Sequence, residues 1–123
     1  MISGLAGTTI FSEDYAKLVP FYRDTLGLSL TREEFGMAFF EQPGGPPLML
    51  GTHSEISGSA KEPARQIPAL LSDDIRGDYA RLTSLGVKST GEPVEQGPVT
   101  FVTICDPEGN LVNLVQFALK DRA

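Results

Sequence analysis

The chain has 123 residues, a formal net charge of -6 and 41% hydrophobic residues, which suits one globular domain with a substantial core. The acidic balance argues against nucleic-acid binding, which requires a basic face, and no apolar run approaches the roughly 20 residues of a membrane span. The N-terminal residues lack the basic region and long apolar core of a signal peptide, and the single cysteine, Cys105, precludes an intrachain disulfide. We therefore expect a cytoplasmic protein with no nucleic-acid or membrane partner.

The first half of the chain predicts a strand, a helix and three further strands. Residues 5–11 predict the first strand, and Ser12 followed by two acids is typical of a helix start. Apolar residues then recur at steps of three and four, and Gly27 suits a left-handed C-cap. Pro20 interrupts this helix, so either the helix is kinked there or a separate turn precedes a helix that begins late. Later strands are predicted at residues 28–31, 37–42 and 48–52, with a turn at 43–47.

The second half repeats the first after a polar linker at residues 54–65. Residues 66–71 predict a strand, Ser72 followed by two acids repeats the helix start, and Gly86 repeats the C-cap. The parallel indicates an internal repeat within a single domain, 1–123, with halves 1–53 and 66–123.

A β-hairpin over residues 100–117 dominates the end of the chain, after a short predicted strand at 88–94. Two runs rich in Val, Ile, Leu, Phe and Thr flank Asp106-Pro107-Glu108-Gly109. Asp suits the first position of a type I turn, Pro presets φ at the second, and Gly can take a positive φ. Cys105 lies among apolar residues of the first hairpin strand, so we expect a buried small hydrophobe rather than a reactive thiol.

Each half therefore predicts a small curved sheet with a helix on its convex side. The other side can bury its apolar residues only against a second sheet or a ligand. Two such units predict an α+β fold in which two βαβββ modules form an incomplete barrel around a central cleft, and concave apolar sites of this kind bind small molecules.

Two stretches carry a family resemblance, residues 21–28 (Phe-Tyr-Arg-Asp-Thr-Leu-Gly-Leu) and residues 106–114 (Asp-Pro-Glu-Gly-Asn-Leu-Val-Asn-Leu). They resemble the most recognisable motifs of the vicinal-oxygen-chelate superfamily, which includes glyoxalase I, the bleomycin-resistance proteins and the extradiol dioxygenases. The resemblance covers nearly the whole chain. It implies a glyoxalase/bleomycin-resistance-like domain of paired βαβββ modules, usually in a homodimer, but one fold hosts many functions.

Metal-dependent members of this superfamily hold an ion through His, Glu or Gln on four strands. Carried over residue by residue, these places fall on Gly7, on or beside Leu50, on Ile67 and on Asn113. Gly, Leu and Ile have no donor atom, and an amide oxygen is a weak ligand for transition metals. If the alignment slipped by one residue, it would add only the neutral amides of Gln66 or Gln116. The single histidine, His53, is expected in an exposed loop and not as a metal ligand. We therefore predict no metal and no other cofactor, which argues against glyoxalase I and extradiol dioxygenase chemistry.

Strand alternation gives the predicted cleft lining, although either parity could face inward. The predicted residues are Gly7, Thr9, Phe39, Leu48, Leu50, Ile67, Phe101, Thr103 and Asn113. Two rings, aliphatic walls and a few hydroxyl or amide groups suit a moderately hydrophobic small molecule, and the acidic charge favours a neutral or cationic one. Arg32 and Arg65 near strand ends could anchor an anion, but a surface role is favoured for both.

The leading hypothesis is a metal-free small-molecule-binding protein of the bleomycin-resistance type, in which a dimer sequesters or senses its ligand. We assign no catalytic residue, because one His and one Cys without supporting motifs give no nucleophile–base arrangement. The alternative is a metal-dependent lyase or dioxygenase with misaligned ligands, and a metal-free isomerase is a third possibility. Whether the protein is an enzyme stays open at this point.

Overall fold

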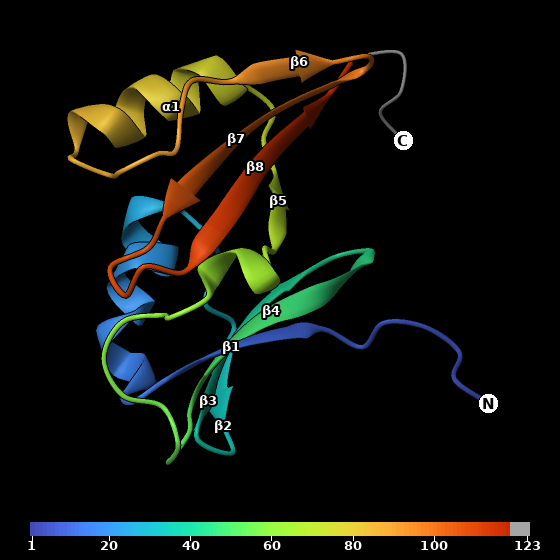
Figure 1. The fold of residues 1–123 in the computed structure, drawn as a ribbon. Coiled ribbons are helices and arrows are strands. Elements are labelled where there is room, and N and C mark those ends of the chain that lie inside the picture. Colours follow the sequence, from blue (N-terminus) through green and yellow to red (C-terminus); the bar gives the residue numbers. More distant parts are fainter. Residues whose placement is uncertain (119–123) are drawn as a thin grey trace. The chain divides into compact units, whose positions relative to one another are not determined.

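The computed structural model describes residues 1–118, which fall into two compact units that divide after Gly58. Each unit contains one four-stranded sheet and follows the order strand, helical segment and three strands (Figure 1). This confirms the predicted α+β fold of two βαβββ modules, and each sheet is open rather than closed into a barrel. No helix in residues 1–118 is long and apolar enough to cross a membrane.

In the first unit the strand order is β1-β4-β3-β2. β1 runs parallel to β4, whereas β3 pairs antiparallel with both β4 and β2. The elements are β1 (Thr8–Ser12), the 3₁₀ turn η1 (Tyr15–Lys17), the π-helical segment η2 (Phe21–Thr25), β2 (Arg32–Glu34), β3 (Met37–Gln42) and β4 (Gly45–Thr52).

The second unit repeats this topology with the order β5-β8-β7-β6, in which β5 is parallel to β8. Its elements are the 3₁₀ turn η3 (Pro63–Arg65), β5 (Ala69–Leu71), α1 (Ile75–Ser84), β6 (Val94–Gln96), β7 (Val99–Cys105) and β8 (Leu111–Phe117). The predicted hairpin is confirmed as β7 and β8, and Gly109 has the expected positive φ of 81°.

Pro20 decides the form of the helical segment in the first unit. A separate 3₁₀ turn, η1, precedes it, and Pro20 is the N-cap of η2, which confirms the late helix start over the kinked alternative. Proline has no N–H and is tolerated at a helix start. Leu26 N donates to Phe21 O at 2.8 Å, the wide spacing of a π-helix.

The two helix starts differ from the prediction in one respect. Ser12 and Ser72 are not the caps, because the side chains of Asp14 and Asp74 accept the first helical N–H groups. Each serine instead lies two residues earlier, is buried, and accepts a hydrogen bond from the backbone N–H of the aspartate, at 3.1 Å and 3.2 Å. The same device at residues 12 and 72 supports the register of the internal repeat.

Several strand boundaries differ from the prediction. Strands β1 and β5 begin three residues later than expected, at Thr8 and Ala69. The second strand lies at 32–34 rather than 28–31, because the tight turn at Phe35-Gly36 fixes its pairing with β3. β6 begins at Val94, where the predicted strand ended. β4 begins at Gly45 although prolines follow at positions 46 and 47. Pairing with β1 starts only at Leu48, so both prolines lie where β4 is an edge strand and proline is tolerated.

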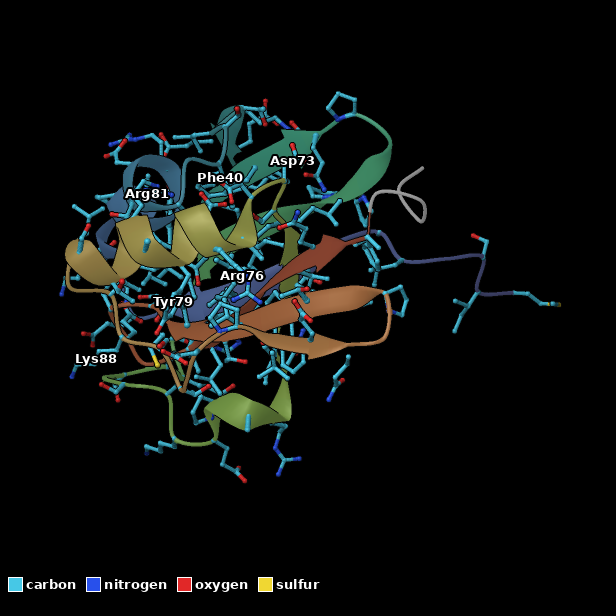
Figure 2. The ribbon with its side chains drawn as sticks, turned by 90° about the horizontal axis from the view of Figure 1, so that it is seen from above. Phe40, Asp73, Arg76, Tyr79, Arg81 and Lys88 are labelled. Carbon is cyan, nitrogen blue, oxygen red and sulfur yellow. The ribbon has the colours of Figure 1, made fainter. Side chains whose placement is uncertain are left out.

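Each unit has its core between its sheet and its own helical segment. In the first unit the largest fully buried side chains are Tyr22, Leu18 and Leu50, and the Tyr22 and Phe40 rings lie 6.4 Å apart. In the second unit α1 lies along β7 and β8 (Figure 2). Its buried residues are Ile75 and Leu82. A fully buried side chain of this size contributes about 1.5–3 kcal/mol.

Candidate functional site

The strand pairing sorts the first sheet into two faces. Thr9 pairs with Met49, Met49 pairs with Phe39, and Phe39 pairs with Arg32, so these four side chains form one row across all four strands. Neighbouring residues in each strand point to the opposite side, where Phe40 meets Tyr22 of η2. We call the side with the Thr9 row the distal face, because it lies opposite the unit's own helical segment.

The predicted lining residues of the first unit do not share one face. Thr9 and Phe39 lie on the distal face, but Leu48 and Leu50 pair with Thr8 and Ile10 on the helix side. Leu50 has no exposed surface and Leu48 only 8%. The prediction was therefore wrong for both leucines, which are core residues. Met49, which lies between them, takes the distal position.

Gly7 lies beside Met49, just before β1. A Cβ placed on Gly7 would meet Met49 Cε at 2.8 Å and the carbonyl oxygen of Pro47 at 2.9 Å. The thioether methyl group could move aside, but the backbone carbonyl could not. Glycine at residue 7 therefore allows β4 to approach closely.

Arg32 covers the end of the row on the distal face. Its Cζ lies 4.1 Å from the centre of the Phe39 ring, while its guanidinium donates to Glu34 at 2.7 Å and to Glu41 at 3.3 Å. Partial desolvation opposes its charge, but the two carboxylates outweigh this effect and raise the pKa of Arg32. With its charge already balanced in this way, Arg32 is a poor anchor for an anionic ligand.

His53 lies in a loop, as the sequence predicted, but it is less exposed than expected. It follows β4 directly, is half-buried, and its ring meets Phe11 edge-on at a centroid distance of 5.2 Å. Its Nδ1 accepts a hydrogen bond from Glu55 N at 3.1 Å. Phe11 belongs to the distal parity of β1 and packs over Gly51, so this aromatic pair extends the distal face. The alternation of β1 could have identified Phe11 from the sequence.

In the second unit the structure brings three predicted residues together. Thr103 pairs with Asn113, and Phe101 lies two residues from Thr103 on the same side of β7. Asn113 also pairs with Ala69 of β5, so Ala69, Asn113 and Thr103 form a row across the sheet. Gln116 lies on the opposite side, where its Oε1 accepts from Ile75 N at the start of α1. The Asn113 side is therefore the distal face of the second sheet.

One predicted residue of this unit lies outside its sheet, and one was missed. Ile67 is half-buried but precedes β5, so strand alternation does not apply to it. Cys105 is half-buried on the same side of β7 as Thr103, rather than fully buried as expected. The alternation that identified Thr103 also identifies Cys105.

The internal repeat corrects the place on β4 that corresponds to Asn113. Ser12 and Ser72 occupy corresponding positions in the two halves, so Thr9 and Ala69, each three residues earlier, also correspond. Thr9 pairs with Met49, and Ala69 pairs with Asn113. Met49, not Leu50, is therefore the counterpart of Asn113.

The four places implied by the family are therefore Gly7, Met49, Ile67 and Asn113, and this donor set does not fit a metal ion. Glycine and isoleucine have no donor, a thioether suits only soft ions, and one neutral amide is a weak ligand. The Pro47 carbonyl also limits any larger side chain at residue 7. Among residues 1–118 no three His, Cys, Asp or Glu side chains cluster so that they could hold an ion.

A hollow of about 530 Å³ lies elsewhere, on the helix side of the second sheet. It is bordered by the start of α1, by Gln116 and by the ion pair between Arg76 and Glu95, whose Nη2 and Oε1 atoms lie 3.1 Å apart. Figure 2 shows Arg76 reaching from α1 toward the strands. Because Gln116 has the parity opposite to Asn113, this hollow is separate from the distal face.

Comparison with known proteins agrees with this architecture. The sequence profile of the Glyoxalase/Bleomycin resistance protein/Dioxygenase superfamily matches residues 4–114. The chain belongs to this superfamily. It is similar to the uncharacterized protein YurT of Bacillus subtilis (strain 168), with 32% identity over 124 aligned positions that cover 89% of this chain and 95% of YurT.

Solved structures share the fold at lower identity. A putative glyoxalase family protein from Bacillus anthracis has a TM-score of 0.74 at 16% identity, covering 95% of this chain and 97% of that protein. TnmS3, an antibiotic-binding protein from Streptomyces sp. CB03234, has a TM-score of 0.72 at 24% identity, covering 95% and 98%. At these identities the likeness concerns the fold.

Proposed function

We propose that this protein binds a small, moderately hydrophobic molecule on the distal faces of its sheets, without a metal ion. The observation that carries the proposal is the identity of the four residues at the metal places of the family, Gly7, Met49, Ile67 and Asn113, which offer no adequate donor set. The antibiotic-binding protein TnmS3 has the same fold, so this fold is compatible with a binding role.

The side chains of the distal faces indicate the kind of ligand. Met49 and Phe101 are half-buried and offer polarizable apolar surface, Phe39 is only 8% exposed beneath Arg32, and Thr9 adds a hydroxyl group. Arg32 is already paired with two carboxylates, and the chain has a net charge of -6. A neutral or cationic ligand therefore fits better than an anionic one.

We also propose that the protein acts as a cytoplasmic homodimer, as is usual in this superfamily. A single cysteine is compatible with a reducing compartment. Sedimentation equilibrium of the full chain tests the dimer, and a monomer at micromolar concentration would overturn this part of the proposal.

Thermal unfolding in the presence of a panel of antibiotics and metabolites tests the binding role. A ligand that binds only the folded state raises the Tm by mass action. We expect at least one neutral or cationic aromatic compound to raise the Tm of the wild type but not of Met49→Lys, which places a charge on the distal face. Ser54→Lys, a matched change at an exposed loop position, should respond like the wild type. A panel without any stabilising compound, combined with measured turnover of a substrate, would overturn the proposal.

A further inference from the structure

The side-chain amide of Asn113 has a defined orientation on the distal face of the second sheet. The Thr103 hydroxyl donates to Asn113 Oδ1 with an O···O distance of 2.6 Å. This distance is typical of an O–H···O bond and short for an N–H···O bond, so the oxygen of the amide, not its nitrogen, faces Thr103. The hydroxyl group thereby orients the amide so that its nitrogen, Nδ2, points away from Thr103.

The other end of this amide is available to a ligand. No residue within 1–118 accepts a hydrogen bond from Asn113 Nδ2. No fully buried polar side-chain atom in this part of the chain lacks a partner, so Nδ2 must keep contact with solvent. On the side away from Thr103 the neighbour in the row is Ala69, whose methyl group offers no acceptor to this nitrogen.

We propose that Asn113 recognises a hydrogen-bond acceptor, such as a carbonyl oxygen, on the ligand, and that Thr103 is the positioning residue that fixes the amide for this task. The inference rests on the proposed function and defines the ligand class further, as an aromatic or aliphatic molecule that carries a carbonyl group. The surrounding surface suits such a ligand because Phe101 and Val115 lie next along the two strands and supply apolar contacts.

A pair of isosteric probes tests this inference, acetophenone and α-methylstyrene, which differ only in a carbonyl oxygen replaced by a methylene group. Both are titrated into the ¹⁵N-labelled full chain while the Asn113 side-chain amide is followed by NMR. One neutral hydrogen bond predicts about threefold to tenfold tighter binding of the ketone. At equal occupancy we also expect the ketone to shift the Nδ2 resonances more than the alkene does.

Variants separate recognition from folding. Asn113→Asp should remove the preference for the ketone, because a carboxylate has no N–H to donate. Thr103→Val should reduce the preference by releasing the amide, whereas Thr103→Ser, which keeps the hydroxyl, should restore it. Thr100→Val makes the same change on the same strand but on the opposite face, and it should keep the wild-type preference.

The possible failures are distinguishable. Equal affinity for both probes, with an unchanged Asn113 resonance, would overturn the inference and leave the proposed function standing. Absence of any shift at the distal faces with either probe would count against both.

Discussion

The terminal methyl group of Met49 fills the space that a side chain at residue 7 would need. A Cβ on Gly7 would lie 2.8 Å from Met49 Cε and 2.9 Å from the Pro47 carbonyl oxygen. Because Gly7 and Met49 occupy two of the four places at which metal-dependent relatives hold an ion, this contact bears directly on function. The contact leaves no room at residue 7 for a side chain that could coordinate a metal ion.

Gly7→Ala is therefore expected to destabilise the protein. The new methyl group meets backbone as well as side chain, and forced overpacking of this kind costs about 1–3 kcal/mol. Urea unfolding gives the free energy of unfolding, and Gly4→Ala is the matched control because nothing lies within 4 Å of its Cβ position. Equal stability of the two variants would show that the space at residue 7 is not restricted.

Phe35 is held in an unfavourable backbone conformation at the tip of the β2–β3 hairpin. It has a φ of 57° and its side chain is exposed, while Gly36 follows with a φ of 69°. A left-handed conformation costs a residue with a Cβ about 1–2 kcal/mol, and asparagine tolerates it best in a turn of this kind. Phe35→Asn should therefore raise the free energy of unfolding by about 1 kcal/mol, as measured in urea.

Phe35→Ala is the control for this stabilisation. It removes the exposed ring but keeps the strained backbone, so it should gain less than Phe35→Asn. If the alanine variant is as stable as the asparagine variant, the effect comes from the ring and not from the backbone.

Asp106 organises the β7–β8 turn. It is buried, its Oδ1 accepts from the backbone N–H groups of Glu108 and Asn110, and its Oδ2 accepts from Asn110 Nδ2 at 2.9 Å. Asp106→Ala leaves these donors without their acceptor and should cost about 3 kcal/mol, since each buried loss is worth about 1–3 kcal/mol.

Asp106→Asn keeps an amide oxygen for the two backbone donors, so we expect its stability to fall between the wild type and Asp106→Ala. Thermal unfolding of the three proteins gives the order. An alanine variant that is as stable as the wild type would rule out this role for the carboxylate.

The lowered pKa of Glu41 makes the stability of the fold depend on pH. The Thr31 hydroxyl donates to its carboxylate at 2.7 Å and, with a further contribution from Arg32, lowers its pKa against the opposing effect of desolvation. A lowered folded-state pKa means that the carboxylate stabilises the fold above the ordinary glutamate pKa of about 4.3. This contribution is lost as the pH falls through the lowered value.

Thr31→Val should therefore raise the pKa of Glu41 toward its ordinary value, as measured by a ¹³C NMR titration of the carboxyl carbon. Thr90→Val, at an exposed position in the other unit, should leave the titration unchanged. An unshifted Glu41 in the Thr31 variant would mean that Arg32 alone sets its pKa.

The sequence predicted the fold because its local signals agreed with one another. The turn residues around Gly109, the strand propensity beside them and the helix ends at Gly27 and Gly86 all mark the elements that the structure contains. Strand boundaries were less predictable because pairing, not propensity, decides them, as at β2, where the Phe35-Gly36 turn fixes the register.

The candidate site was only partly predictable. Alternation placed Thr103 and Asn113 together correctly, since both lie in a regular hairpin. It failed at Leu50, because the apolar run of β4 gives no sign of which parity meets the helical segment, and one residue of slip exchanges the two faces. The hydrogen bond between Thr103 and Asn113 depends on side-chain rotamers, which no sequence pattern records.

Metal content is the most direct test of the proposed metal-free function. The full chain is expressed with zinc, nickel, manganese and iron supplied, purified without chelators, and analysed by inductively coupled plasma mass spectrometry alongside thermal unfolding with and without EDTA. We predict far less than one ion per chain and a Tm that EDTA does not change. One tightly bound ion per chain, whose removal by EDTA lowers the Tm, would contradict this account.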